Sequence, residues 1–97
     1  MSVTVIGIFK KLGAEDFEVY RSHVGASIAL YGGTVIRRGE CATPFWNQLN
    51  ADPFDTFVEL SFSDIDAAKR WAESPEYAKL LPVRNRAMQL TLFVVKS

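Results

Sequence analysis

The stretch Ser2–Lys10, SVTVIGIFK, decides the fold because both of its faces are largely apolar. A strand places alternate residues on opposite faces. One face therefore takes Val3, Val5, Gly7 and Phe9, and the other takes Thr4, Ile6, Ile8 and Lys10. A strand that is apolar on both sides needs cover on both sides. We therefore expect this strand to lie at the centre of a sheet.

A helix is predicted to follow this strand. Gly13 can serve as its N-cap, and Glu15 and Asp16 then lie in the first turn, where carboxylates suit the positive end of the helix dipole. Apolar residues recur at helical spacing and form one stripe that faces a core: Phe17, Tyr20, Val24, Ile28 and Tyr31. The helix is expected to end at Gly32-Gly33, where a left-handed residue closes the last turn without steric cost.

The rest of the chain supplies three more strands and a second helical region. The strands are predicted at Thr34–Glu40, Thr56–Phe62 and Met88–Val95. Residues 63–87 are predicted as short helices with breaks near Ser74 and Pro82. The order strand, helix, strand, strand, helix, strand favours a ferredoxin-like α+β sandwich with a four-stranded antiparallel sheet. We expect residues 1–97 to form one such domain.

The apolar composition also predicts a partner. The chain has 97 residues, of which 48% are hydrophobic, and two short helical layers can cover only one face of a four-stranded sheet. The other face still carries apolar side chains, so something outside the monomer must cover it. A homodimer that packs two such sheets face to face is the simplest closed solution.

Composition excludes several other classes of protein. Eleven basic side chains balance eleven acidic ones, so we expect neither nucleic acid nor an anionic membrane as partner. Cys41 is the only cysteine, which excludes an internal disulfide and fits a reducing, cytoplasmic compartment. The sequence has no glycine-rich phosphate loop, nucleophile elbow or paired-histidine metal motif, so we expect no cofactor and no metal.

One connection is longer than most loops of a compact domain. Residues 41–55, CATPFWNQLNADPFD, include two prolines and the aromatic residues Phe45, Trp46 and Phe54. Loops of this length are usually functional or disordered, and the aromatic content argues against disorder. Two roles remain open for it: it caps its own pocket, or it reaches a partner subunit.

Two motifs together resemble the bacterial family called domain of unknown function 1330. The first is Tyr31-Gly32-Gly33 followed by a strand with Arg38-Gly39, and the second is Trp71-x-x-Ser74-Pro75-Glu76-Tyr77. The resemblance spans nearly the whole chain and places it in the dimeric α/β-barrel group, which implies a ferredoxin-like fold and a dimer with a shared barrel. The wider group includes cofactor-independent monooxygenases of small aromatic substrates and isomerase-like members. The segment Cys41–Asp55 departs from the family pattern because the second hairpin is longer here.

Few side chains are candidates for chemistry. His23 is the only histidine, the residue type that exchanges protons most readily near neutral pH, and it lies on the flank of the first helix. It is either a solvated residue at the rim or a catalytic base. Arg21 and Arg84 lie near apolar surface and need partners, which are either a protein carboxylate (Glu59, Glu76 or Asp66) or the carboxylate of a ligand. Of the consecutive Arg37 and Arg38, which point to opposite faces, one is expected to pair with Glu59.

Aromatic side chains predict where a ligand would lie. Tyr20, Trp71 and Tyr77 either pack as core or line a pocket between the helices and the sheet. We therefore expect a homodimer that binds a small aromatic or carboxylate metabolite, with Arg21, Trp71, Tyr77 and Arg84 as ligand contacts. If it is an enzyme, the resemblance implies a cofactor-independent monooxygenase or isomerase, with His23 or Tyr20 moving a proton. The alternative is a non-catalytic dimerisation or regulatory module whose pocket is filled by its own side chains.

Overall fold

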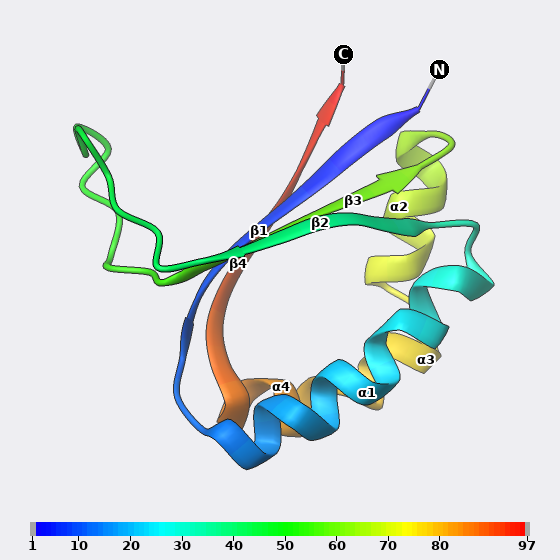
Figure 1. Cartoon of the computed structure of the whole chain (residues 1–97). Helices are drawn as coiled ribbons and strands as arrows, with labels where there is room; N and C mark the ends of the chain where they lie inside the picture. The colour runs from blue at the N-terminus through cyan, green and yellow to red at the C-terminus, as the bar shows by residue number, and fades with distance from the viewer. Residues whose placement is uncertain (1, 97) are drawn as a thin grey trace.

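The helices cover one face of a four-stranded antiparallel sheet and leave the other face bare (Figure 1). The computed structural model describes residues 2–96. Along the chain the elements are β1 (Val3–Lys11), α1 (Ala14–Leu30), β2 (Thr34–Glu40), β3 (Thr56–Phe62), α2 (Ile65–Ala72), α3 (Pro75–Ala78), α4 (Leu81–Ala87) and β4 (Met88–Lys96). The predicted α+β, ferredoxin-like class is confirmed by this order and by the sheet order β2-β3-β1-β4.

Strand β1 lies in the middle of the sheet, as its two apolar faces predict. It pairs antiparallel with β3 on one side and with β4 on the other. The face toward the helices, which we call the inner face, carries the buried residues Val3, Val5, Gly7 and Phe9. The predicted division of β1 into two faces is therefore confirmed.

Helix α1 begins and ends where its sequence predicts. Gly13 is the N-cap in an extended conformation, and Glu15 and Asp16 lie in the first turn. At the other end Gly32 adopts a φ of 76°, the left-handed conformation that glycine takes without strain. The amide of Gly33 then donates to the carbonyl of Ile28 at 3.0 Å, which closes the last turn.

The helical region from residue 63 to residue 87 is broken at the two predicted places. Asp64 caps α2 by accepting from the Ala67 amide at 2.8 Å, and Ser74 caps α3 by accepting from the Tyr77 amide at 3.0 Å. Pro82 lies in the first turn of α4, where its missing N–H is not needed by the helix. Pro82 therefore lies at the start of α4 and at the same time prevents α3 from continuing into it.

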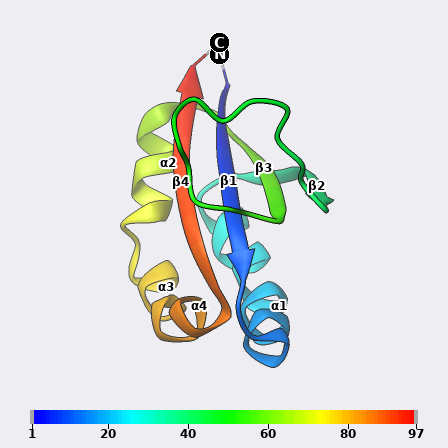
Figure 2. The same ribbon diagram turned by 90° about the vertical axis from the view of Figure 1, so that its left-hand side faces the viewer.

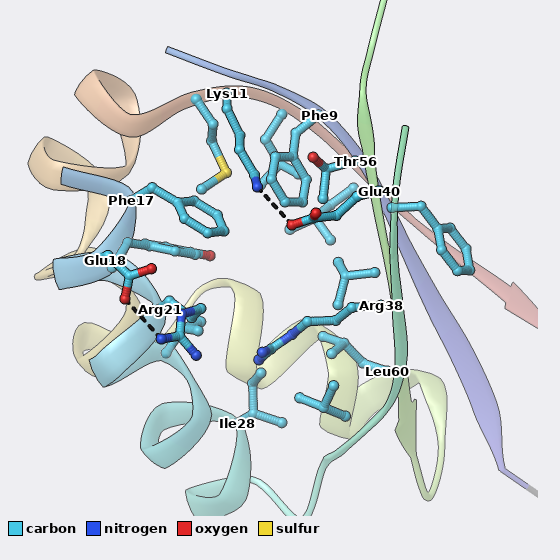
Figure 3. A pocket seen from close by; sticks show the side chains of 18 of the residues that line it. Phe9, Lys11, Phe17, Glu18, Arg21, Ile28, Arg38, Glu40, Thr56 and Leu60 are labelled. Carbon is cyan, nitrogen blue, oxygen red and sulfur yellow. Dashed lines mark hydrogen bonds and ion pairs between the residues drawn. The ribbon is translucent and has the colours of Figure 1, made fainter. Parts of the chain in front are cut away.

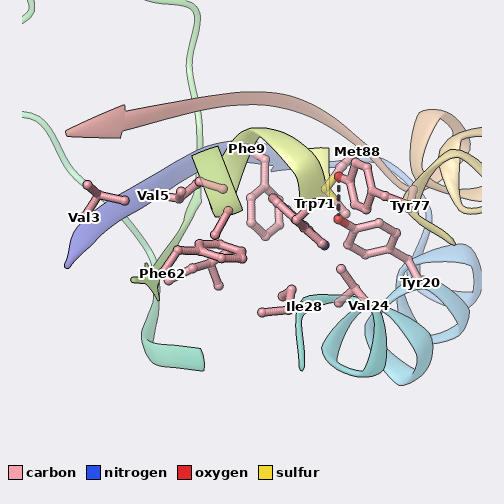
Figure 4. Packing of buried hydrophobic residues seen from close by; sticks show 14 residues of the cluster. Val3, Val5, Phe9, Tyr20, Val24, Ile28, Phe62, Trp71, Tyr77 and Met88 are labelled. Carbon is pink, nitrogen blue, oxygen red and sulfur yellow. Dashed lines mark hydrogen bonds between the residues drawn. The ribbon is translucent and has the colours of Figure 1, made fainter. Parts of the chain in front are cut away.

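The core joins α1, α2 and the inner face of the sheet around two large aromatic residues (Figure 4). Phe62 and Trp71 are almost completely buried, with ring centroids 5.6 Å apart. The indole Nε1 of Trp71 donates to the Ser27 Oγ at 3.1 Å, and Ser27 donates in turn to the Val24 carbonyl. Trp71 therefore fixes α2 against α1 through both packing and a satisfied hydrogen bond.

The opposite face of the sheet, which we call the outer face, is apolar and has no helix over it in the described chain (Figure 1). Pairing register places these residues there: Ile6, Ile8, Phe57, Phe93 and Val95. Phe93 is 44% exposed and Val95 is 41% exposed. The apolar face that the sequence predicts is thus present, and the homodimer that would cover it remains a prediction.

The long connection between β2 and β3, residues 41–55, forms an arm that extends from the sheet. Figure 2 shows it passing in front of β1 and β4, on the side away from the helices. Its large apolar side chains are almost fully exposed: Phe45 by 93%, Trp46 by 87% and Leu49 by 95%. The arm therefore does not cover the helical side of its own protomer.

None of the helices between residues 2 and 96 combines the length and the apolar character that a membrane crossing requires.

Two glycine substitutions test the packing between α1 and the sheet. A Cβ on Gly33 would lie 2.6 Å from Ile28 Cγ2 and 2.6 Å from Phe62 Cε1. We expect Gly33→Ala to lower the free energy of unfolding by about 1–3 kcal/mol through overpacking. A Cβ on Gly25, within α1, meets nothing within 4 Å, so Gly25→Ala should raise the free energy of unfolding by about 0.5–1 kcal/mol. Urea unfolding followed by circular dichroism measures both, and equal effects would contradict the packing described here.

Candidate functional site

A cavity of about 500 Å³ lies between α1 and the inner face of the sheet (Figure 3). All four strands, α1 and Trp71 of α2 contribute to its walls, which are mainly apolar. The principal apolar residues are Phe9, Phe17, Ile28, Val35, Leu60 and Leu90. No residue of the arm lines the cavity. Of the two roles left open for residues 41–55, capping the protomer's own pocket is therefore excluded in this conformation.

Two ion pairs lie at the edge of this pocket (Figure 3). The Lys11 Nζ is 3.0 Å from the Glu40 Oε1, which joins the end of β1 to the end of β2, and it also lies 4.8 Å from the centroid of the Phe17 ring. Arg21 pairs with Glu18 one turn earlier on α1 at 2.8 Å. Arg21 was expected to pair either with one of Glu59, Glu76 and Asp66 or with the carboxylate of a ligand; the three protein partners are wrong, because Arg21 pairs with Glu18 on the same helix.

Arg38 lines the pocket without a protein partner. It lies opposite Val58 in the β2–β3 register, on the inner face, and no ion pair or hydrogen bond in residues 2–96 involves its guanidinium. Its neighbour Arg37 points to the outer face and pairs with Glu59 at 3.3 Å. The predicted pairing of one of these arginines with Glu59 is confirmed. Sequence reasoning did not place Arg38 in the site, because the face that Arg38 takes depends on the irregular register of β2 against β3.

Tyr20 forms a buried hydroxyl chain at the pocket wall (Figure 4). Its hydroxyl oxygen lies 2.8 Å from that of Tyr77, and the Arg84 Nη1 donates to the Tyr77 hydroxyl at 3.1 Å. Burial, and then the neighbouring Tyr77 hydroxyl, raise the pKa of Tyr20 well above its ordinary value near 10. Tyr20 therefore stays protonated, so at neutral pH it can donate a hydrogen bond but is not a base.

The predicted site residues separate into two groups. Tyr20, Arg21 and Trp71 line the pocket. Tyr77 and Arg84 do not line it, because they lie behind Tyr20, with the Arg84 guanidinium 5.6 Å from the Tyr77 ring centroid. Arg84 was expected to pair with a carboxylate from the protein or a ligand, but in the described chain its partner is the Tyr77 hydroxyl.

His23 lies outside the pocket. Its side chain is on the exposed side of α1, and its Nδ1 donates to the Val19 carbonyl oxygen at 2.8 Å. The Ser22 Oγ lies 3.0 Å from the same nitrogen. The structure therefore does not bring His23 to Tyr20, and of the two interpretations of this residue its position matches the solvated one.

Metal-ligating side chains do not gather anywhere in residues 2–96: no group of three histidine, cysteine, aspartate or glutamate residues is close enough together to hold an ion.

A one-sided antiparallel sheet with a pocket beneath its first helix defines a protein of the ferredoxin-like α+β class. Within that class, the chain belongs to the family described as "Domain of unknown function (DUF1330)", whose model matches residues 5–97. No curated protein matches the sequence.

Solved structures with the same fold come from several bacteria. A protein of unknown function from Rhodopseudomonas palustris has a TM-score of 0.80 at 16% identity, over 99% of this chain and 82% of that one. SnoaB, a cofactor-independent oxygenase from Streptomyces nogalater, has a TM-score of 0.67 at 18% identity, over 99% and 92%. A dimeric protein of unknown function with a ferredoxin-like fold from Bacteroides fragilis has a TM-score of 0.59 at 15% identity, over 99% and 96%. At these identities the likeness shows the fold alone.

The raised pKa of Tyr20 predicts a pH-dependent stability. The folded protein holds the Tyr20 proton more tightly than the unfolded chain, in which the pKa lies near 10.0. The resulting stabilisation is complete below pH 10 and declines as the pH rises above that value, by at most about 1.4 kcal/mol per pH unit. Tyr20→Phe removes this decline and costs about 1 kcal/mol at neutral pH through the lost hydrogen bond.

Urea unfolding at pH values from about 8 to about 11, on both sides of the ordinary tyrosine pKa of about 10, measures how the free energy of unfolding changes with pH. Tyr31→Phe is the control, because Tyr31 bonds to Glu76 at the surface and leaves the Tyr20 site intact. As the pH rises above about 10, the free energy of unfolding of the wild type and of Tyr31→Phe should fall more steeply than that of Tyr20→Phe. Parallel curves for wild type and Tyr20→Phe would contradict the assignment.

Proposed function

We propose that this protein binds a small, largely apolar metabolite in the pocket between α1 and the inner face of the sheet. The observation that carries the proposal is the cavity itself. Its volume of about 500 Å³ lies within the range of about 300–1,000 Å³ usual for small-molecule sites. Apolar walls with a few polar groups at the edge match the usual composition of such sites. The alternative of a regulatory module with a filled pocket fits this volume poorly.

The chemistry favoured for an enzyme of this kind is cofactor-independent oxygenation or isomerisation of an aromatic substrate. A similar fold occurs in SnoaB, whose described activity is cofactor-independent oxygenation. In such a reaction Tyr20, which lines the pocket, donates a hydrogen bond to a substrate oxygen and stabilises negative charge there, while Tyr77 donates to the Tyr20 oxygen. Tyr77 and Arg84 act behind it as positioning residues. His23 has no part in this proposal because it lies outside the pocket.

The second part of the proposal concerns assembly: two copies of the chain pack outer face to outer face. The outer face bears exposed Phe93 and Val95, and the similar protein from Bacteroides fragilis is described as dimeric. Four strands spaced about 4.8 Å apart and about 25 Å long give a flat area on the order of 500 Å². A stable interface usually buries about 800 Å² per partner.

The arm, residues 41–55, supplies the missing area. It extends on the outer side of the sheet, and its exposed side chains include Phe45 and Trp46 (Figure 2). An aromatic side chain buries about 150–250 Å² when it packs. Each arm therefore lies against the partner subunit in the proposed dimer. The single cysteine favours a reducing, cytoplasmic compartment.

Filling the pocket tests the binding proposal. Val35 is half-buried and lines the cavity, so Val35→Phe should occupy part of its volume. In thermal-shift measurements over a panel of aromatic and aliphatic metabolites, ligands at about 100 times their Kd should stabilise the wild type by about 2.7 kcal/mol. The variant should lose this stabilisation. Val19→Phe is the matched control, because Val19 is 48% exposed on α1 and outside the pocket. Equal shifts in all three proteins, or none in the wild type, would defeat the proposal.

Removing the arm's aromatic side chains tests the dimer. Sedimentation velocity at micromolar concentration should find the wild type dimeric and Phe45→Ser/Trp46→Ser at least about tenfold more dissociated, since each lost aromatic contact is worth about 1.4 kcal/mol or more. Leu30→Ser is the control, since Leu30 is 68% exposed on α1, on the helical side. A monomeric wild type would refute the dimer, and a double variant that dimerises as tightly as wild type would refute the role of the arm.

A further inference from the structure

We propose that Arg38 binds the carboxylate of the pocket's ligand, so that the ligand class is an organic acid with an apolar aromatic or aliphatic body and one carboxylate. This inference rests on the proposed function, because it assigns a substrate class to the same pocket. It is carried by the charge balance of the pocket and by the way β2 is built.

The pocket holds one uncompensated positive charge. Five charged residues line it: Lys11, Glu18, Arg21, Arg38 and Glu40. Two ion pairs neutralise four of them, at 3.0 Å between Lys11 and Glu40 and at 2.8 Å between Arg21 and Glu18. Arg38 remains, with no ion pair or hydrogen bond to any residue from 2 to 96. A ligand with a single negative charge would complete this balance.

An irregularity in β2 directs Arg38 into the pocket. The β2–β3 register shifts between Val35 and Arg37, which is a β-bulge with Ile36 as the extra residue. Without the bulge, strand alternation would place Arg37 on the same face as Val35, which is the inner face, and would turn Arg38 outward. With it, Arg37 reaches Glu59 on the outer face and Arg38 enters the pocket, as Figure 3 shows. Bulges commonly redirect a side chain next to a functional site.

The chemistry of the guanidinium selects a carboxylate. Its planar fork makes two parallel N–H···O bonds to a carboxylate, and these charge-assisted bonds are among the strongest in proteins. A phosphate dianion would leave one negative charge uncompensated beside Glu18 and Glu40. When an apolar body fills the cavity, it displaces water from around Arg38, so an uncharged ligand would leave the guanidinium poorly solvated. The neutral analogue of an acid should therefore bind more weakly than the acid.

Matched pairs of probes test this directly. We would measure, by isothermal titration calorimetry at low salt, the binding of 2-naphthoate against 2-naphthamide and of decanoate against decanamide. In each pair the apolar body is the same and only the charge differs. The wild type should bind the acid about 10- to 100-fold more tightly than the amide, the range expected for a hydrogen-bonded charge pair.

Neighbouring arginines supply the variants. Arg38→Gln should bind acid and amide with equal affinity, whereas Arg37→Gln should keep the wild-type preference, because Arg37 points to the other face and pairs with Glu59. Arg38→Lys should keep part of the preference, since it retains the charge but loses the fork. Both arginines are exposed, so the substitutions leave the core untouched, which circular dichroism checks.

Each outcome decides between the proposals. Equal binding of acid and amide by the wild type overturns the role of Arg38 but leaves the pocket a binding site. If Arg37→Gln loses the preference for the acid over the amide as fully as Arg38→Gln does, the role of Arg38 is also overturned, because the preference then depends only on the net charge of the protein. If neither probe pair binds, the assigned ligand class is wrong. The proposed function is tested separately: it also fails if no metabolite of the panel stabilises the wild type more than Val35→Phe.

Discussion

A central strand that is apolar on both faces, in a chain whose helices cover only one of them, is the constraint on which the rest of this structure depends. Helices α1 and α2 bury the inner face of β1 around Phe62 and Trp71. The outer face keeps Ile6, Ile8 and Phe93 in contact with solvent in the single chain. Apolar area of this kind is costly to leave in water, so the same feature that organises the fold is also the basis of the proposed dimer.

The inner face is not packed uniformly, and the pocket arises from this difference. Near the end of α1, Ser27 and Ile28 lie close against Trp71 and Phe62, held by the indole hydrogen bond. The cavity lies between the rest of α1 and the sheet, and Ile28 and Trp71 of the packed region also line it. Ion pairs hold the edges of the opening, one of them between the ends of β1 and β2. The site is therefore built on regular elements, which position side chains more accurately than loops do.

Two polar groups give this cavity its chemical character, and they differ in kind. Tyr20 is buried and stays protonated, and its hydroxyl is hydrogen-bonded to that of Tyr77, which accepts from Arg84. Arg38 is solvated, permanently charged and free of protein partners in the described chain. These two groups are the basis of the proposal that the ligand is apolar in its body and polar at its ends.

Local pattern alone determined a large part of this protein: the strand and helix order, the central place of β1, the helix ends at Gly32-Gly33 and Ser74, and the bare apolar face. These features follow from periodicity and capping, which act within a few residues of the chain. Only the tertiary structure decided which candidate side chains meet. In the tertiary structure His23 and Arg84 lie outside the pocket. Arg21 forms an ion pair with Glu18, and the bulge in β2 directs Arg38 into the pocket. Such outcomes depend on register between strands distant in sequence and on space left between packed elements, and neither is recorded in local periodicity.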